Sequence, residues 1–186
     1  MKLDAKLGFY LKHRDQIDEW AELVELGRVA ADKFFRSLAP AMAPLAKRLG
    51  EVEPFVSFAK GYGKLFLHRS GWREPGAEWP RIAIGLEWQC SKVRFDRAWG
   101  GVWVQAEMDE DGRLARAVES ELRKGPDVAS GFERPEKWWP LWRYEAPEDA
   151  EFWNDLDAFG RQLVSAMEGY WVRFSPVVER AVACAP

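Results

Sequence analysis

The chain has 186 residues, 47% of them hydrophobic and 31% charged, and a net charge of −3 at pH 7. This length and composition are typical of one globular domain with a self-sufficient core, and they exclude an intrinsically disordered chain. Because 27 basic residues are interleaved with 30 acidic ones, the sequence also argues against non-specific nucleic-acid binding, which requires a basic excess or stripe.

Cysteines and apolar runs bear on the compartment and on bound groups. Cys90 and Cys184 are the only cysteines, which is too few for a secreted disulfide framework or, with His13 and His68, for a simple zinc site. Residues 1–6 lack the apolar stretch of a signal peptide, and no apolar run approaches the ~20 residues of a membrane-spanning helix. We expect a cytoplasmic protein with no cofactor, no bound metal and no membrane association.

Helical periodicity dominates residues 1–50. Apolar side chains recur at helical spacing over 3–24 and again over 29–49, and Gly27 separates the two runs. Prolines inside the second run predict a kink or restart near Ala39. We predict an antiparallel helical hairpin.

The hydrophobic period changes to two between residues 54 and 107. Within 81–89, the apolar Ile82, Ile84, Leu86 and Trp88 alternate with small or polar residues, which predicts a strand with one buried face. The segments that we predict as strands here are 55–58, 64–68, 81–89, 92–96 and 102–107. Short connections between them favour an antiparallel meander.

Helices return in the last part of the chain. Residues 112–124 form a short amphipathic pattern, 141–145 predict a further strand, and the region from Pro147 onward is helical, with a restart at Ser175-Pro176. We therefore predict one α+β domain over 1–186. It comprises a helical hairpin (1–50), an antiparallel sheet of about five strands (54–107), and helices with one further strand (112–186), the C-terminal helices packing on one sheet face.

Catalytic signatures are weak throughout. A restriction-endonuclease type of metal site needs an acid and then a lysine two residues later on one strand, but Glu87-Trp88-Gln89 has glutamine in the lysine position. The acidic run that begins at Glu107 fails the calcium-loop pattern and fits the N-terminus of a helix better. We assign no catalytic residue and lean against an enzyme. A divergent metal-assisted hydrolase or nuclease using Glu87, Glu107 and His68 is kept as an alternative.

The polar side of the predicted sheet is one candidate surface. If the predicted strands pair in this antiparallel order, the polar side carries Phe66, His68, Glu87, Arg94, Trp103, Gln105 and Glu107. Small residues at Ala83 and Gly85 leave space for a ligand or for a packed helix. This side is either a small-ligand binding surface, with Trp103 stacking on the ligand, or an ordinary face partly covered by the C-terminal helix.

A Trp-rich acidic segment, residues 133–157, is the second candidate surface. It contains Trp138, Trp139 and Trp142, and its eight acidic residues outnumber three basic ones. Exposed rings would anchor a basic protein partner, whereas buried rings would only close the core. The sequence favours a non-enzymatic interaction or adaptor protein with these tryptophans at the contact, and it leaves the oligomeric state open.

Overall fold

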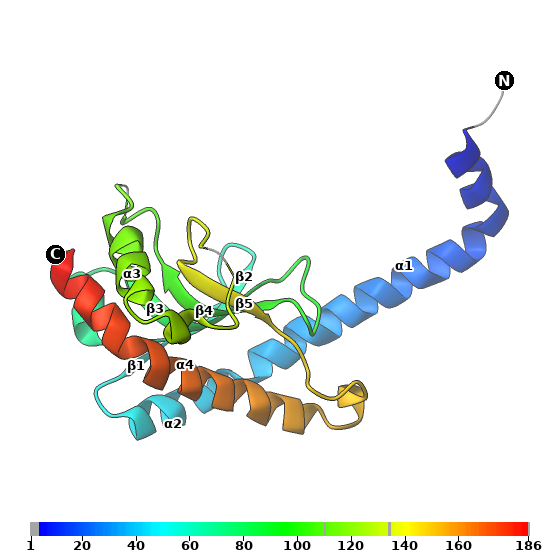
Figure 1. Ribbon diagram of the computed structural model, residues 1–186. Helices are drawn as coiled ribbons and strands as arrows, with labels where there is room; N and C mark the ends of the chain where they lie inside the picture. The colour runs from blue at the N-terminus through cyan, green and yellow to red at the C-terminus, as the bar shows by residue number, and fades with distance from the viewer. Residues whose placement is uncertain (1–3, 110, 134, 186) are drawn as a thin grey trace.

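The computed structural model describes residues 4–109, 111–133 and 135–185, and it has an α+β fold (Figure 1). One antiparallel sheet has the order β1-β2-β3-β4-β5, so the predicted meander and fold class are confirmed. Its strands are β1 (Glu53–Ser57), β2 (Tyr62–His68), β3 (Ile82–Gln89), β4 (Ala98–Val104) and β5 (Leu141–Glu145). The helices are α1 (Ala5–Ser37), α2 (Ala39–Leu49), α3 (Arg113–Arg123) and α4 (Leu156–Cys184). Short 3₁₀ turns occur at Ser70–Trp72, Pro126–Ala129 and Phe152–Asn154.

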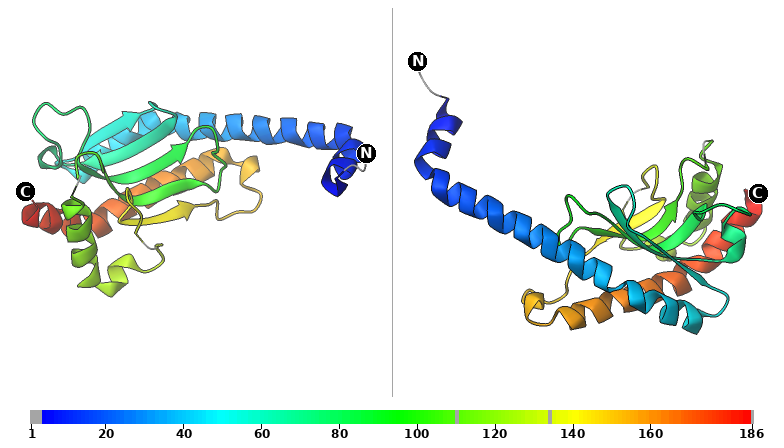
Figure 2. Two further views of the ribbon diagram at one scale, coloured as in Figure 1. Left: turned by 90° about the horizontal axis from the view of Figure 1, so that it is seen from above. Right: turned by 180° about the vertical axis from the view of Figure 1, so that it is seen from behind.

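The main core lies between the sheet and two helices, because α2 and α4 cover the same sheet face (Figures 1 and 2). The alternating residues of β3 that were predicted to be buried, Ile82, Ile84, Leu86 and Trp88, are completely inaccessible to solvent and belong to this core. Burial of such side chains contributes roughly 1.5–3 kcal/mol each. The period-two pattern therefore identified the helix-covered face correctly.

The N-terminal region differs from the predicted hairpin. α1 runs through Gly27 without a break, because one helical glycine costs only about 1 kcal/mol relative to alanine. The chain instead restarts at Ala39, as the prolines predicted. Pro40 sits in the first turn of α2, where no intrahelical N–H is needed. The result is one bent helix whose first part, α1, projects away from the sheet (Figures 1 and 2).

A second difference concerns β4. Residues 92–96 form a turn, and β4 begins at Ala98 and passes through Gly100-Gly101, which lie between the predicted strands 92–96 and 102–107. The glycines are needed inside the strand for close approach: a Cβ on Gly101 would lie 2.2 Å from the carbonyl oxygen of Leu141. The strand ends at Val104, three residues earlier than predicted.

The C-terminal helices also form differently in part. The 112–124 prediction is confirmed by α3, whose N-terminal amides are bound by a nearby acid: the N–H groups of Leu114 and Ala115 donate to Asp109 at 2.9 and 3.0 Å. The restart predicted at Ser175-Pro176 is wrong, because Pro176 lies inside the continuous α4. Burial of Phe174 and Val178 beside the proline keeps the helix packed on the sheet there.

Candidate functional site

The sheet face opposite α2 and α4 carries a second cluster of rings, here called the aromatic face. Its buried members are Phe66, Ala83, Trp103 and Trp139, and the partly buried ones are Phe55, Trp79, Trp99, Trp138 and Trp142. The rings of Phe66 and Trp103 lie 5.0 Å apart between centroids. The chain before β5 folds over this face, and the Val104 N–H donates to the carbonyl of Trp138 at 2.9 Å. The aromatic face is thus a small second core and not a solvated surface.

A buried ion pair lies within the aromatic face. Lys64 and Glu87 are direct partners across β2 and β3, their charged groups are in contact, and the residues are only 8% and 6% exposed. The indole N–H of Trp139 donates to the second carboxylate oxygen of Glu87 at 3.2 Å. Burial raises the pKa of Glu87, while the Lys64 ammonium and the Trp139 N–H oppose that rise.

Aromatic rings surround the ammonium of Lys64. Its Nζ lies 5.0 Å from the ring centre of Trp103 and between 5.3 and 5.7 Å from those of Tyr62, Phe66 and Trp79. Cation–π attraction of this kind is the means by which aromatic cages hold ligand cations. Here the cage is filled by a lysine of the protein itself, so the arrangement stabilises the fold and offers no vacant cation site.

The structure brings together some of the predicted sheet residues and separates the others. Phe66, Glu87 and Trp103 share the aromatic face, as predicted. His68 lies at the end of β2 and is 1% exposed, with Nδ1 3.0 Å from the carbonyl oxygen of Arg69. Because it is buried at the end of β2, it does not present an imidazole to a shared site.

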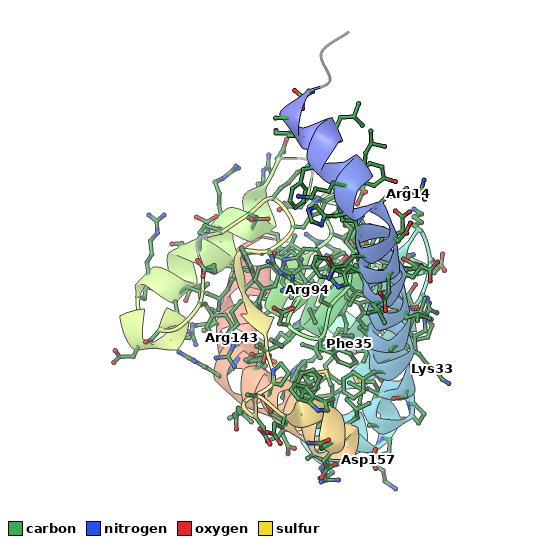
Figure 3. All side chains as sticks on the ribbon, turned by 90° about the vertical axis from the view of Figure 1, so that its right-hand side faces the viewer. Arg14, Lys33, Phe35, Arg94, Arg143 and Asp157 are labelled. Carbon is green, nitrogen blue, oxygen red and sulfur yellow. The ribbon has the colours of Figure 1, made fainter. Side chains whose placement is uncertain are left out.

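Three predicted residues lie outside the strands, which corrects their placement on one sheet face. Arg94 is exposed in the β3–β4 turn, where it pairs with Asp96 at 2.6 Å (Figure 3). Gln105 and Glu107 follow the end of β4, so strand alternation no longer orients them. The Gln105 side-chain oxygen is buried without a hydrogen-bond partner, whereas Glu107 is exposed.

The residues named for the hydrolase alternative lie in different surroundings. Glu87 is occupied by Lys64 and Trp139, while Glu107 is exposed beyond the strand end. Within residues 4–109, 111–133 and 135–185, no three His, Cys, Asp or Glu side chains are grouped so as to hold a metal ion.

In the Trp-rich acidic segment, the three tryptophans predicted as anchors are largely covered, whereas Trp153 is 61% exposed. Trp139 is 5% exposed, and Trp138 and Trp142 are partly buried against the aromatic face. Their acidic neighbours include a helix cap, since Asp155 accepts from the Ala158 N–H at 2.8 Å. The expectation that several of these rings are solvent-exposed is therefore not met.

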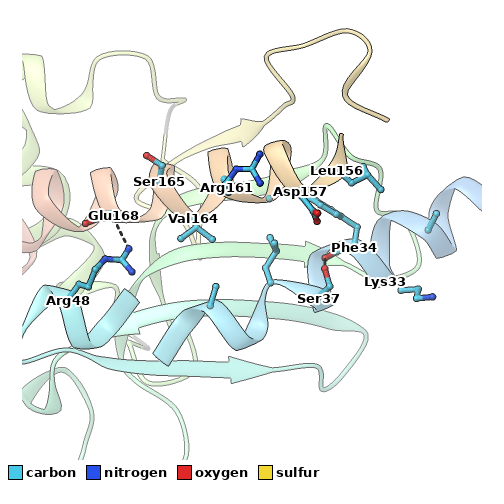
Figure 4. Close-up of a pocket in the computed structure, with 14 residues that line it drawn as sticks. Lys33, Phe34, Ser37, Arg48, Leu156, Asp157, Arg161, Val164, Ser165 and Glu168 are labelled. Carbon is cyan, nitrogen blue, oxygen red and sulfur yellow. Dashed lines mark hydrogen bonds and ion pairs between the residues drawn. The ribbon is translucent and has the colours of Figure 1, made fainter. Parts of the chain in front are cut away.

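A groove of about 850 Å³ lies where α1 meets α2, across from the N-terminal half of α4 (Figure 4). Its floor is apolar and includes Phe34 and Leu38 on one side and Val164 on the other. The ion pair between Arg48 and Glu168, 3.0 Å apart, crosses one end. Sequence reasoning missed this groove because it depends on how the bent helix crosses α4.

The projecting part of α1 is the most unusual surface. Within α1, the buried residues are Ala31, Phe34 and Phe35, near its C-terminal end. Figure 3 shows Phe35 beside the sheet and Arg14 far out along the same helix. At 100° per residue, the face that buries these residues continues outward through Gly27 to Val24, Leu23 and Trp20.

We call Trp20, Leu23 and Val24 the apolar stripe. Their side chains are 56%, 57% and 72% exposed. Single exposed apolar residues are ordinary, but three large ones together on an isolated helix are not. None of the helices among the described residues is long and apolar enough to cross a membrane. The stripe thus extends the core-facing side of α1 into solvent.

Comparison with known proteins gives no family: no family model, no curated protein and no solved structure matches this chain.

Proposed function

We propose that this chain is a non-catalytic protein-interaction protein, and that it binds another polypeptide through the apolar stripe of α1. The observation that carries the proposal is the exposure of Trp20, Leu23 and Val24 on a helix that projects from the fold. Covering a Leu or Val side chain contributes roughly 1.5–3 kcal/mol, and tryptophan is the residue most enriched at binding hot spots.

The interaction role is the one that the sequence suggested, but the proposed binding surface is on α1 and not on the Trp-rich acidic segment. Trp138, Trp139 and Trp142 pack against the sheet, so they are poor anchors for a partner. The apolar stripe is better suited to this role, because the side chains of Trp20, Leu23 and Val24 face solvent. A helix that presents apolar residues at i, i+3 and i+4 is a common way for one polypeptide to bind another.

Photo-crosslinking tests this proposal. We expect a benzophenone amino acid at Val24 to form covalent adducts with a polypeptide in the cell that expresses the chain. The matched control places the same group at Arg123 on α3, whose side chain is 81% exposed, because the side of α1 opposite the stripe also carries the exposed Leu26 and Val29. Adducts at Val24 and few at Arg123 support the proposal. No polypeptide adduct at Val24, or equal adducts at both positions, contradicts it.

A further inference from the structure

The charges on α1 are segregated along its length. Residues 5–14 contain Lys6, Lys12 and Arg14 and no acidic residue. Residues 15–25 contain no basic residue, and their acidic residues are Asp15, Asp18, Glu19, Glu22 and Glu25. α1 therefore carries a basic block, residues 5–14, followed directly by an acidic block, residues 15–25.

The basic block also carries exposed apolar side chains. Leu7, Phe9 and Leu11 are 45%, 62% and 53% exposed. The kink at His13 lies between Phe9 and the apolar stripe, so the basic block forms its own short helical segment. Each block thus combines charges of one sign with solvent-exposed aromatic or aliphatic side chains.

We infer that the partner of the stripe is a second copy of this chain, paired antiparallel along α1. This inference rests on the proposed function and names the occupant of its surface. A two-fold axis between Arg14 and Asp15 lays residues 5–14 of one copy along 15–24 of the other. It sets Phe9 of each copy opposite Trp20 of the other, and it brings each basic block against an acidic block.

The kink in α1 lies next to the proposed axis. Helical geometry is interrupted at His13, which has φ −119° and ψ 19°, one residue before the end of the basic block. The two-fold axis between Arg14 and Asp15 falls just beyond this kink. Such an interface is isologous and closed, as in most homodimers.

Other occupants fit the charges less well. Parallel pairing would place acidic block on acidic block, where like charges repel. An anionic lipid surface attracts helices whose polar faces are rich in Lys and Arg, but the polar residues around the stripe are Asp18, Glu19, Glu22 and Glu25. The antiparallel second copy is the arrangement in which both the apolar and the charged residues are matched.

A charge-exchange experiment on the full chain tests the inference. One variant carries Lys12→Glu and Arg14→Glu, and a second carries Asp18→Lys, Glu19→Lys and Glu22→Lys; all five positions are exposed and lie outside the core. Sedimentation equilibrium should give the wild type a mass of twice one chain, and each variant alone the mass of one chain. An equimolar mixture should regain the double mass, because each reversed block then faces one of opposite sign. Thermal unfolding of each variant checks that the fold is retained.

The outcomes separate this inference from the proposed function. A wild type that stays at the mass of one chain, variants that stay paired alone, or a mixture that stays at single mass would each overturn antiparallel self-pairing. If Val24 still crosslinks to a polypeptide of another mass, the interaction function stands with a different partner. If Val24 gives no polypeptide adduct at all, both fail.

Discussion

Replacement of Glu87 by alanine is expected to lower the free energy of unfolding by about 3–5 kcal/mol, because it leaves the buried ammonium of Lys64 without its counter-charge. The two residues are 6% and 8% exposed, so water cannot readily replace the lost carboxylate. The indole N–H of Trp139 loses its acceptor in the same substitution. Because single domains are stable by about 5–15 kcal/mol, a large part of the stability should disappear, as measured by urea unfolding.

The matched control removes both charges together. A Lys64→Met, Glu87→Leu double variant leaves no uncompensated ion among the rings, and such replacements are often close to neutral. It should therefore be more stable than Glu87→Ala. A Glu87→Ala protein as stable as the wild type, or a double variant less stable than Glu87→Ala, would contradict the role assigned to this pair.

The single Lys64→Met variant carries a pH signature of the same pair. Burial raises the pKa of Glu87 above its ordinary 4.5, and removal of the ammonium removes the main influence that opposes the rise. A raised carboxyl pKa contributes stability that is complete below the unfolded-state value and is lost as the pH rises through the folded-state value. The deficit of this variant relative to the wild type should thus be small in acid and grow toward neutral pH.

Replacement of Gly85 by alanine is the second substitution with a large expected effect. A Cβ at this position would lie 2.1 Å from the carbonyl oxygen of Leu65 and 2.9 Å from the Cα of Phe66, both in the backbone of the neighbouring strand. Overpacking of this kind typically costs about 1–3 kcal/mol, and a clash with backbone in a central strand belongs at or above the top of that range. We expect a much lower urea midpoint or failure to fold.

Gly71→Ala is the control for that substitution. An added Cβ there meets no atom within 4 Å, so its effect should stay within about 0.5 kcal/mol. If Gly85→Ala and Gly71→Ala unfold at the same urea concentration, the close approach of β2 and β3 is not a constraint on this fold.

The parts of the fold that could be predicted are those that periodicity determines. Ile82 to Trp88 alternate because one face of β3 is buried under helices, and that alternation is visible in sequence. The Gly100-Gly101 pair could not be placed, because glycine is equally typical of a turn and of a strand that another backbone approaches closely. The prediction that Gly27 separates two helices was wrong for a related reason, because a single glycine is tolerated inside a helix.

The candidate surface was harder to predict than the fold. Pairing of Lys64 with Glu87 depends on strand register, which residue types alone do not fix. Helical spacing through Trp20 and Val24 is identical whether the stripe is covered by the rest of the chain or by another molecule. Only the arrangement in space, with α1 projecting beyond the sheet, distinguishes a core helix from a binding helix.

Hydrogen–deuterium exchange of residues 17–27 measures most directly whether the stripe is covered. In concentrated wild-type protein these amides should exchange slowly, and dilution or a Val24→Asp substitution should speed their exchange while the amides of β3 stay protected. Exchange of 17–27 that is equally fast at every concentration, and unchanged by Val24→Asp, would contradict pairing of α1 with a second copy.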